Sequence, residues 1–243
     1  MARLGILSDI HGNLFALDKV LEDLSAQNVS GLIILGDLID YGMQSNEVVE
    51  RVRELDQDSI LIKIWGNHEY AILREYYEHF SSSRGVESAK YTRSVLSAEN
   101  SEYLNKEWNP QGVQECTIEG IRFLAVHASL DDPYWKAIAP GSLKGEYSDY
   151  DVVLSGHSHY SFCFTEFYTA DRPEMRNKKA VRFINPGSVG QPRNHIPHAQ
   201  YAVMDTETMQ VDLRCVPYDR EAAMSLYMGQ VDDFYRARLE NGI

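Results

Sequence analysis

Short apolar runs alternate with helical patterns through the first two thirds of the chain. The runs span residues 4–7, 32–35, 60–64, 121–126 and 152–154. Several of them are continuous rather than alternating, as expected of strands that are buried on both faces. Amphipathic helical patterns fill the first two intervals, so the order is strand, helix, strand, helix, strand. This order predicts right-handed crossovers and a sheet with a parallel core.

The two intervening helices have recognisable apolar faces. The face of the first consists of Leu14, Leu17, Leu21 and Leu24. The face of the second consists of Val48, Val52 and Leu55. Asn13 and Ser45 precede these faces, and their side-chain oxygens are expected to cap the helices.

The rest of the chain divides into a helical part and a strand-rich part. Residues 69–108 are polar and helical in pattern, which predicts a helical cap inserted at about 69–110. Strands are expected at 162–168, 180–184, 201–205 and 211–216, and a final helix at about 219–240. No repeat or linker divides the chain, so we expect a single domain over 1–243. Its fold class is α/β, with two stacked sheets flanked by helices.

A polar residue of a metal-binding type follows each of the five apolar runs. These residues are Asp9 with His11, Asp37, Asn67, His127, and His157 with His159. One polar residue at one strand end is common, but five such ends together favour a shared site. Ligands of open α/β sheets bind at the carboxyl ends of the strands, so these side chains should converge. Alternate residues of a strand point to opposite faces, so each x-separated pair can serve one site only where the chain bends.

The donor set indicates which metals would bind. Imidazole, carboxylate and one amide oxygen suit Mn, Fe, Zn or Ni, and the set contains no thiolate. Seven ligands are too many for one tetrahedral ion and fit two ions that share a bridging carboxylate. Two ions roughly 3.5–4 Å apart can hold the attacking and leaving oxygens of an in-line displacement.

These blocks resemble, in their order, those of the calcineurin-like metallophosphoesterases. They are Asp9-x-His11, Gly36-Asp37-x-x-Asp40, Gly66-Asn67-His68-Glu69, His127 and Gly156-His157-x-His159. The runs 8–13 and 185–193 are similar to the bacterial and archaeal phosphodiesterase-like branch of the family. The resemblance covers most of the chain and implies a four-layer α/β/β/α sandwich of two mixed sheets.

The resemblance also implies two divalent metal ions as cofactors. The ligands it implies for the first metal are Asp9, His11, Asp37 and His159, and those for the second are Asp37 as a bridge, Asn67, His127 and His157. A hydroxide between the ions would be the nucleophile, since metal binding lowers the pKa of water. Manganese is the first choice of metal, with Fe, Zn, Ni or Mg as alternatives.

Two further residues take catalytic roles by the same resemblance. His68 would contact the scissile phosphate and stabilise or protonate the leaving oxygen. Asp40 would hold His68 by accepting its other N–H; alternatively, it is a loop carboxylate that caps a turn. Glu69 has the plainer interpretation of a helix-start acid favoured by the helix dipole.

Position 41 departs from the protein Ser/Thr phosphatase branch, in which an arginine that grips phosphate stands there. The residue here is Tyr41, so a cationic side chain elsewhere in the chain is expected to bind the phosphate. Arg193, in a loop rich in Gly and Pro, is our candidate for binding substrate, with His195 as the second choice. The alternative for Arg193 is an exposed loop charge.

Two other features near the site are open to interpretation. Gly187 and Gly190 do not form a nucleotide-binding fingerprint and are expected to permit a tight turn near the site. The Tyr-rich cap between residues 70 and 108 could stack on a base, although tyrosines at helical spacing more often pack inside.

Charge and cysteine content bear on partners and location. The chain has 23 Lys+Arg and 36 Asp+Glu, a net charge of −13, which disfavours long nucleic acids and anionic membranes. No apolar stretch approaches the roughly 20 residues that span a bilayer. The odd, scattered cysteines, Cys116, Cys163 and Cys215, are expected to be reduced, buried thiols of a cytoplasmic protein. Two divalent ions would reverse the charge at the site itself, which favours a small phosphorylated substrate.

Together these features predict a cytoplasmic, dinuclear metal-dependent phosphoesterase. It would hydrolyse a phosphodiester or phosphomonoester bond of a small, nucleotide-like substrate. One alternative is a protein Ser/Thr phosphatase, against which Tyr41 argues. The other is a catalytically dead scaffold of the same fold, against which the complete set of seven ligands and His68 argues.

Overall fold

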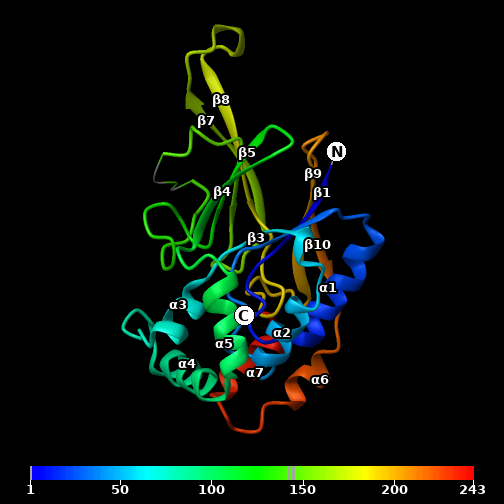
Figure 1. Cartoon of the computed structure of the whole chain (residues 1–243), viewed down its shortest axis with the longest axis vertical. Helices are drawn as coiled ribbons and strands as arrows, with labels where there is room; N and C mark the ends of the chain where they lie inside the picture. The colour runs from blue at the N-terminus through cyan, green and yellow to red at the C-terminus, as the bar shows by residue number, and fades with distance from the viewer. Residues whose placement is uncertain (1, 142, 144–145) are drawn as a thin grey trace.

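Two mixed five-stranded sheets form the centre of the molecule (Figure 1). The computed structural model describes residues 2–141, 143 and 146–243. The first sheet has the order β10-β9-β1-β2-β3, with β1 Arg3–Leu7, β2 Gly31–Ile34, β3 Ile60–Lys63, β9 Ala199–Asp205 and β10 Val211–Val216. The second has the order β4-β5-β6-β8-β7, with β4 Val113–Ile118, β5 Ile121–Val126, β6 Val152–Ser155, β7 Phe162–Thr169 and β8 Lys178–Asn185.

Each sheet has a parallel centre, as the sequence predicts. Strands β1, β2 and β3 run parallel, and so do β5, β6 and β8. The remaining strands pair antiparallel at the edges: β9 with β1, β10 with β9, β4 with β5 and β7 with β8. The carboxyl ends of the parallel strands therefore supply the loops that carry the candidate site residues.

Apolar side chains from both sheets fill the space between them. This core includes Leu4, Ile6 and Ile33 of the first sheet and Phe123 and Leu154 of the second, all fully buried. Such residues come from continuous apolar runs, because both faces of each central strand are covered.

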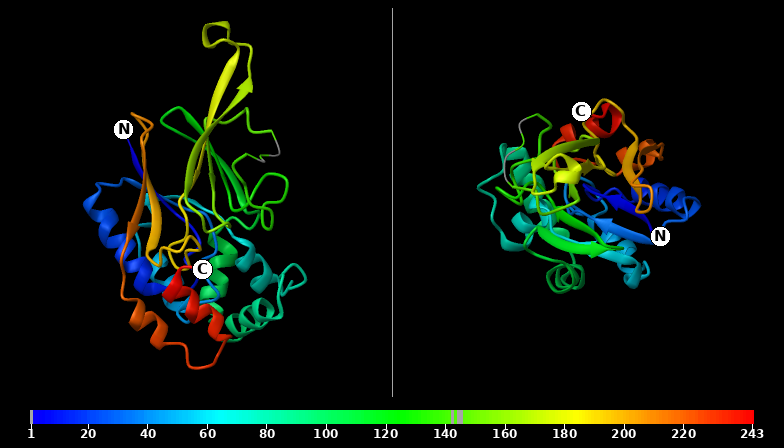
Figure 2. Two further views of the ribbon diagram at one scale, coloured as in Figure 1. Left: turned by 180° about the vertical axis from the view of Figure 1, so that it is seen from behind. Right: turned by 90° about the horizontal axis from the view of Figure 1, so that it is seen from above.

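Helices cover the outer face of the first sheet. They are α1 Leu14–Ala26, α2 Ser45–Arg53, α6 Arg220–Ser225 and α7 Asp233–Asn241. Figure 2 shows α6 and α7, in orange and red, on the same side as α1, which contacts α6. The outer face of the second sheet is covered by Ile138, Tyr147 and Tyr150, from the segment between β5 and β6. The fold class of two mixed sheets flanked by helices is confirmed.

Three more helices follow β3, in the region of the expected cap. They are α3 Asn67–Arg74, α4 Ser83–Val95 and α5 Ala98–Glu107. Short 3₁₀ turns lie at Gln57–Ser59 and Pro173–Met175. The assignment of the chain as a single domain with a cap insertion stays a prediction. No helix of the described residues is long and apolar enough to cross a membrane.

Several local predictions need correction. The expected final helix is two helices, separated by residues 226–232, where Gly229 has a φ of +91°. Asn13 caps α1 as predicted, since its side chain accepts from the Ala16 N–H. Ser45 does not cap α2; its hydroxyl accepts a hydrogen bond from the Asp40 N–H instead, over 3.1 Å. Strand β4 was not expected, because it is a half-buried edge strand without a continuous apolar run.

The prediction of buried cysteines is wrong. Cys116 is half-buried, Cys163 and Cys215 are exposed, and all three are unpaired. They lie on β4, β7 and β10, which are edge strands of the two sheets. The β7–β8 hairpin even extends beyond the body of the molecule, at the top of Figure 1. An edge strand has a more solvated environment than the central strands whose residues form the core.

Candidate metal centre

Two pairs of candidate ligands, each separated by one residue, lie where the chain turns sharply at a strand end. Asp9 and His11 have φ values of 54° and 47°, and His157 and His159 have 61° and 60°. This left-handed region is unfavourable for most residues with a side chain, and residues held in it cluster at functional sites. The bend allows both members of each pair to face one site, as the sequence argument requires.

One group of donor atoms gathers beside β1. The ligand atoms of Asp9, His11 and His159 lie within 4.8 Å of one another. The Nε2 atom of His159 is 3.2 Å from both Asp9 Oδ1 and His11 Nε2. These three residues come from loops after β1 and β6, one in each sheet, so the site joins the two sheets.

A second group of donor atoms includes Asp37. The ligand atoms of Asp37, His127 and His157 lie within 4.8 Å of one another. The Asn67 side-chain oxygen lies 3.0 Å from His127 Nε2 and 2.9 Å from His157 Nδ1. All seven sequence-predicted ligands therefore converge.

Asp37 stands between the two groups. Its Oδ2 atom is 3.7 Å from His11 Nε2 and 3.3 Å from His127 Nε2. Its Oδ1 atom accepts a hydrogen bond from the His68 backbone N–H at 2.9 Å. A carboxylate in this place can share its oxygens between two ions.

Backbone carbonyls orient three of the imidazoles. The Nδ1–H groups of His11, His127 and His159 donate to the carbonyls of Ile39, Leu35 and Gln191, over 3.2, 2.7 and 2.6 Å. A ring that donates through Nδ1 keeps the Nε2 lone pair free for a metal, and such supporting bonds fix the ring orientation. His157 instead turns Nδ1 toward the centre.

The buried donors fit divalent cations. Asp9 is fully buried, and its Oδ1 atom has no hydrogen-bond partner among the described residues. Burial, together with the nearby Asp37 carboxylate, raises the pKa of Asp9 to about 6. Burial also lowers the pKa of His157 to about 3, which keeps its ring neutral. A neutral His157 imidazole and a buried Asp9 oxygen without a hydrogen-bond partner are donors that divalent ions would stabilise.

His68 lies at the edge of this centre, and Asp40 holds it. The His68 Nδ1–H donates to Asp40 Oδ2 over 2.6 Å, and both side chains are buried. The other Asp40 oxygen accepts from the hydroxyls of Ser88 and Thr92 in α4, at 2.6 and 2.9 Å. Asp40 therefore does more than cap a turn. The sequence reasoning missed Ser88 and Thr92; their spacing of four residues on a polar helix was the available signal.

Glu69 supports the loop that carries Asp37. It is fully buried, and its carboxylate accepts from the N–H groups of Asp37, Leu38 and Gly66 at 2.8 Å each, and from Ile39 at 3.2 Å. It also lies in the first turn of α3, as the simpler interpretation states. The four hydrogen bonds add a structural role that the helix-dipole interpretation did not include.

Replacing Glu69 with glutamine should weaken both the fold and metal binding. The new side-chain amide would place an NH₂ group against backbone donors, and we expect the free energy of unfolding to fall by about 2–4 kcal/mol. Urea denaturation and metal titration of the variant would measure both effects. The matched control is Glu47→Gln, which removes an exposed first-turn acid from α2. Equal losses in the two variants would return Glu69 to the helix-dipole interpretation.

A cavity of about 280 Å³ opens onto the centre. Its lining includes Asp37, Asn67, His68, His157, His159, Tyr41 and Arg193. The Arg193 Nε atom is buried and has no hydrogen-bond partner among the described residues. The Tyr41 ring packs between those of His11 and Tyr235, with centroids 4.6 and 4.4 Å away. His195 is exposed and does not belong to the described lining.

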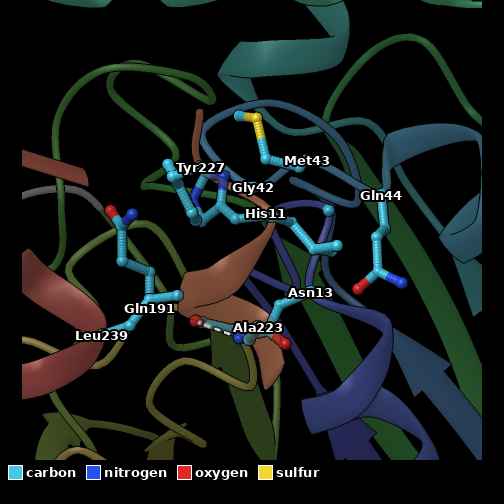
Figure 3. Close-up of a pocket in the computed structure, with 12 residues that line it drawn as sticks. His11, Asn13, Gly42, Met43, Gln44, Gln191, Ala223, Tyr227 and Leu239 are labelled. Carbon is cyan, nitrogen blue, oxygen red and sulfur yellow. Dashed lines mark hydrogen bonds between the residues drawn. The ribbon is translucent and has the colours of Figure 1, made fainter. Parts of the chain in front are cut away.

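His11 also lines a second, much smaller cavity. Figure 3 shows this cavity between the loops of the centre and the C-terminal helices, lined by His11, Asn13, Gln191, Tyr227 and Leu239 among others. Its volume of about 10 Å³ is roughly that of one water molecule. Of these two cavities among the described residues, the larger one therefore has room for a substrate.

The glycine loop after β8 packs tightly against the Asp9 loop. The Gly190 N–H donates to the Asp9 carbonyl over 3.0 Å, and a Cβ atom on Gly190 would lie 1.7 Å from the Ile10 carbonyl oxygen. Gly187 has a φ of +83°. Gly187 therefore permits a tight turn near the site, as predicted, whereas Gly190 permits the close approach of its loop to the Asp9 loop.

Residues 2–209 match the calcineurin-like phosphoesterase superfamily domain. The chain belongs to that superfamily. It is therefore a metal-dependent phosphoesterase by class, and the resemblance of the five sequence blocks is confirmed. An uncharacterized protein of Methanocaldococcus jannaschii is 31% identical over 224 residues, which cover 90% of this chain and 89% of the relative.

Another relative and two solved structures are also similar to this chain. Phosphodiesterase YfcE of Escherichia coli is 24% identical over 219 residues, covering 87% of this chain and 91% of YfcE. The crystal structure of a metallophosphoesterase from Sphaerobacter thermophilus has a TM-score of 0.75 at 25% identity. A hypothetical protein from Pyrococcus horikoshii has a TM-score of 0.79 at 22% identity. Both structural matches cover 100% of this chain and 99% of the other.

Proposed function

We propose that this chain is a dinuclear metal-dependent hydrolase of small phosphoesters. The observation that carries the proposal is the position of Asp37 between two groups of donors that come from both sheets. Asp9, His11, Asp37 and His159 would hold one ion, and Asp37, Asn67, His127 and His157 the other. Manganese is our first choice, with Fe, Zn, Ni or Mg as alternatives.

The ions and the protein would divide the chemical work. Two bound divalent ions supply a lowered pKa for water and positive charge against the phosphate. His68 lies at the edge of the centre, with Nε2 3.9 Å from Asp37 Oδ2 and Nδ1 held by Asp40. From there the protonated ring of His68 donates to the leaving oxygen. Because Asp40 fixes the other nitrogen, the ring keeps one orientation during the reaction.

We propose a small, nucleotide-like substrate. A cavity of about 280 Å³ is at the low end of the usual size for small-molecule sites. A net charge of −13 would repel a polyanion, whereas the proposed ions would attract a phosphate at the site. The similarity to phosphodiesterase YfcE supports a phosphodiester, with a phosphomonoester as the alternative. The free thiols are consistent with a cytoplasmic location.

The alternative functions make different demands on the site. A protein phosphatase of this superfamily would be expected to have an arginine at position 41, where the Tyr41 ring packs against His11 and His68 instead. A catalytically dead scaffold would have no need for the hydrogen bonds that orient three of the imidazoles.

A metal and substrate screen tests the proposal. The chain is stripped with chelator, reloaded with Mn, Fe, Zn, Ni or Mg separately, and assayed on monoesters, diesters, cyclic nucleotides, dinucleoside polyphosphates and phosphopeptides. We expect hydrolysis of small nucleotide esters with at least one metal. Preference for phosphopeptides would favour a protein phosphatase, and no hydrolysis with any metal would favour the scaffold.

Replacing Arg193 with alanine should raise KM. The guanidinium lines the cavity, and loss of a charged hydrogen bond of roughly 1.5–3 kcal/mol corresponds to about a tenfold to hundredfold higher KM for anionic substrates. Steady-state kinetics would measure KM for the variant and the parent. The control is Arg172→Ala, which removes an exposed arginine between β7 and β8. Equal KM values for parent and Arg193→Ala would make Arg193 an ordinary loop charge.

A further inference from the structure

Three aromatic rings that do not belong to the proposed ligand set line the 280 Å³ cavity. They are those of His79, Phe80 and Trp135, which we call the aromatic wall. His79 and Phe80 lie between α3 and α4, and Trp135 lies between β5 and β6. Two segments far apart in the sequence therefore meet at the opening that leads to the proposed metal centre.

The rings of the wall continue outward from His68. Phe80 meets His68 edge to face, with centroids 5.2 Å apart, and meets Trp135 in the same way at 5.6 Å. Trp135 stacks on His79, with centroids 5.3 Å apart and planes inclined by 20°. An uninterrupted series of aromatic contacts thus runs from His68 to the outer part of the cavity.

The loop around Trp135 is well anchored. The Asp132 carboxylate accepts from the N–H groups of Tyr134 and Trp135 at 3.1 and 3.0 Å. The Tyr134 ring stacks on Tyr70, with centroids 4.7 Å apart. These contacts hold the indole at the cavity although it is only half-buried.

Trp135 differs from the other tryptophans of the chain. Trp65 and Trp108 belong to the core and are 0% and 2% exposed. A half-exposed indole that lines a cavity and stacks on an exposed imidazole can accept a further planar ring. The tyrosines of the helical cap do not belong to the described lining of this cavity. The residues of the aromatic wall are therefore better candidates for stacking on a base than those tyrosines.

We infer that the aromatic wall binds a planar aromatic part of the substrate's leaving group, such as a nucleobase. This inference rests on the proposed function and specifies which side of the substrate selects for aromatic chemistry. His68 acts on the leaving oxygen, so the leaving group begins beside His68. Phe80 contacts His68, so that group extends along Phe80 toward Trp135. Aromatic faces suit bases, because every base has a face that stacks.

Tryptophan fluorescence tests binding to the wall without turnover. The probe is adenosine monophosphate added to the metal-loaded chain, excited where adenine does not absorb. Because Trp65 and Trp108 are buried, we expect quenching from Trp135 and a loss of that quenching in Trp135→Phe. Glycerol phosphate and inorganic phosphate should cause much less quenching. Equal quenching by adenosine monophosphate and glycerol phosphate would overturn the inference.

Selectivity in catalysis gives the second measurement. For Trp135→Ala, the ratio of kcat/KM for a nucleotide ester to that for a glycerol ester should fall about tenfold or more, since loss of base stacking has effects of this order. Trp135→Phe keeps an aromatic ring and should retain most of the ratio. Phe167→Ala, an exposed aromatic on β7, serves as the control and should leave activity unchanged.

The outcomes separate this inference from the proposed function. An unchanged ratio in Trp135→Ala, with both esters still hydrolysed, would overturn the wall and leave the phosphoesterase intact. Quenching by adenosine monophosphate without hydrolysis of any ester would support the wall and contradict the proposed function. If kcat/KM for a hexyl ester exceeded that for the glycerol ester by the same factor as kcat/KM for the nucleotide ester, the wall would be a merely apolar surface. That result would overturn the stacking of a planar ring.

Discussion

Replacing Asp37 with alanine should remove the bound metal and abolish hydrolysis. Its Oδ2 atom lies within 3.7 Å of a donor in each group, so its loss removes a ligand from both proposed ions at once. Loss of a residue that only supports a ligand costs roughly 10–100-fold, and we expect the loss here to be larger. Elemental analysis and a turnover assay on the purified variant would measure both effects.

The Asp37→Ala experiment needs a check of folding and a matched control. Circular dichroism would show whether the variant keeps its structure, because the Asp37 carboxylate also accepts from the His68 N–H. Asp171→Ala removes an exposed aspartate beyond β7 and should keep parental metal content and rate. Full turnover of Asp37→Ala with two bound ions would refute the bridging role.

Replacing His68 with asparagine should slow the chemistry and leave metal binding intact. General acid catalysis contributes roughly a hundredfold to ten-thousandfold, so kcat should fall by about that factor. The loss should be greatest for alkyl esters, whose leaving oxygen needs a proton, and smallest for nitrophenyl esters. A series of esters with graded leaving groups, assayed at fixed metal content, would measure this dependence.

The contact between His68 and Asp40 offers a companion variant. Asp40→Asn should act in the same direction as His68→Asn but more weakly, because the ring is still present while its orientation is less fixed. Hydrolysis of an alkyl ester by His68→Asn at the parental rate would exclude the role of general acid.

The convergence of the ligands could be predicted because it follows from the sheet. Parallel strands end at one edge, so residues such as Asp9, Asp37 and His127 must approach one another once the strands are recognised. The bends at Asp9 and His157 were inferred from the need for both members of a pair to face one site. Their positive φ values are the corresponding finding.

Supporting residues were harder to predict because their function depends on tertiary contacts. Ser88 and Thr92 lie on a polar helix that is far in sequence from Asp40, and their spacing of four residues places them on one face without identifying Asp40 as the partner. Trp135 lies in a segment without a periodic pattern, so its approach to Phe80 appears only in the folded chain. Ser45 had the chemistry of a cap, but its hydroxyl accepts from the Asp40 N–H rather than from a helix donor.

Metal stoichiometry coupled to turnover tests the central claim most directly. The chelator-treated chain is titrated with Mn, and bound metal and hydrolysis of a nucleotide ester are followed together. We predict negligible turnover without metal, and activity that rises to a plateau as two ions bind per chain. Turnover in the metal-free chain equal to that of the loaded chain, or a plateau of activity without bound metal, would contradict a dinuclear metal-dependent phosphoesterase.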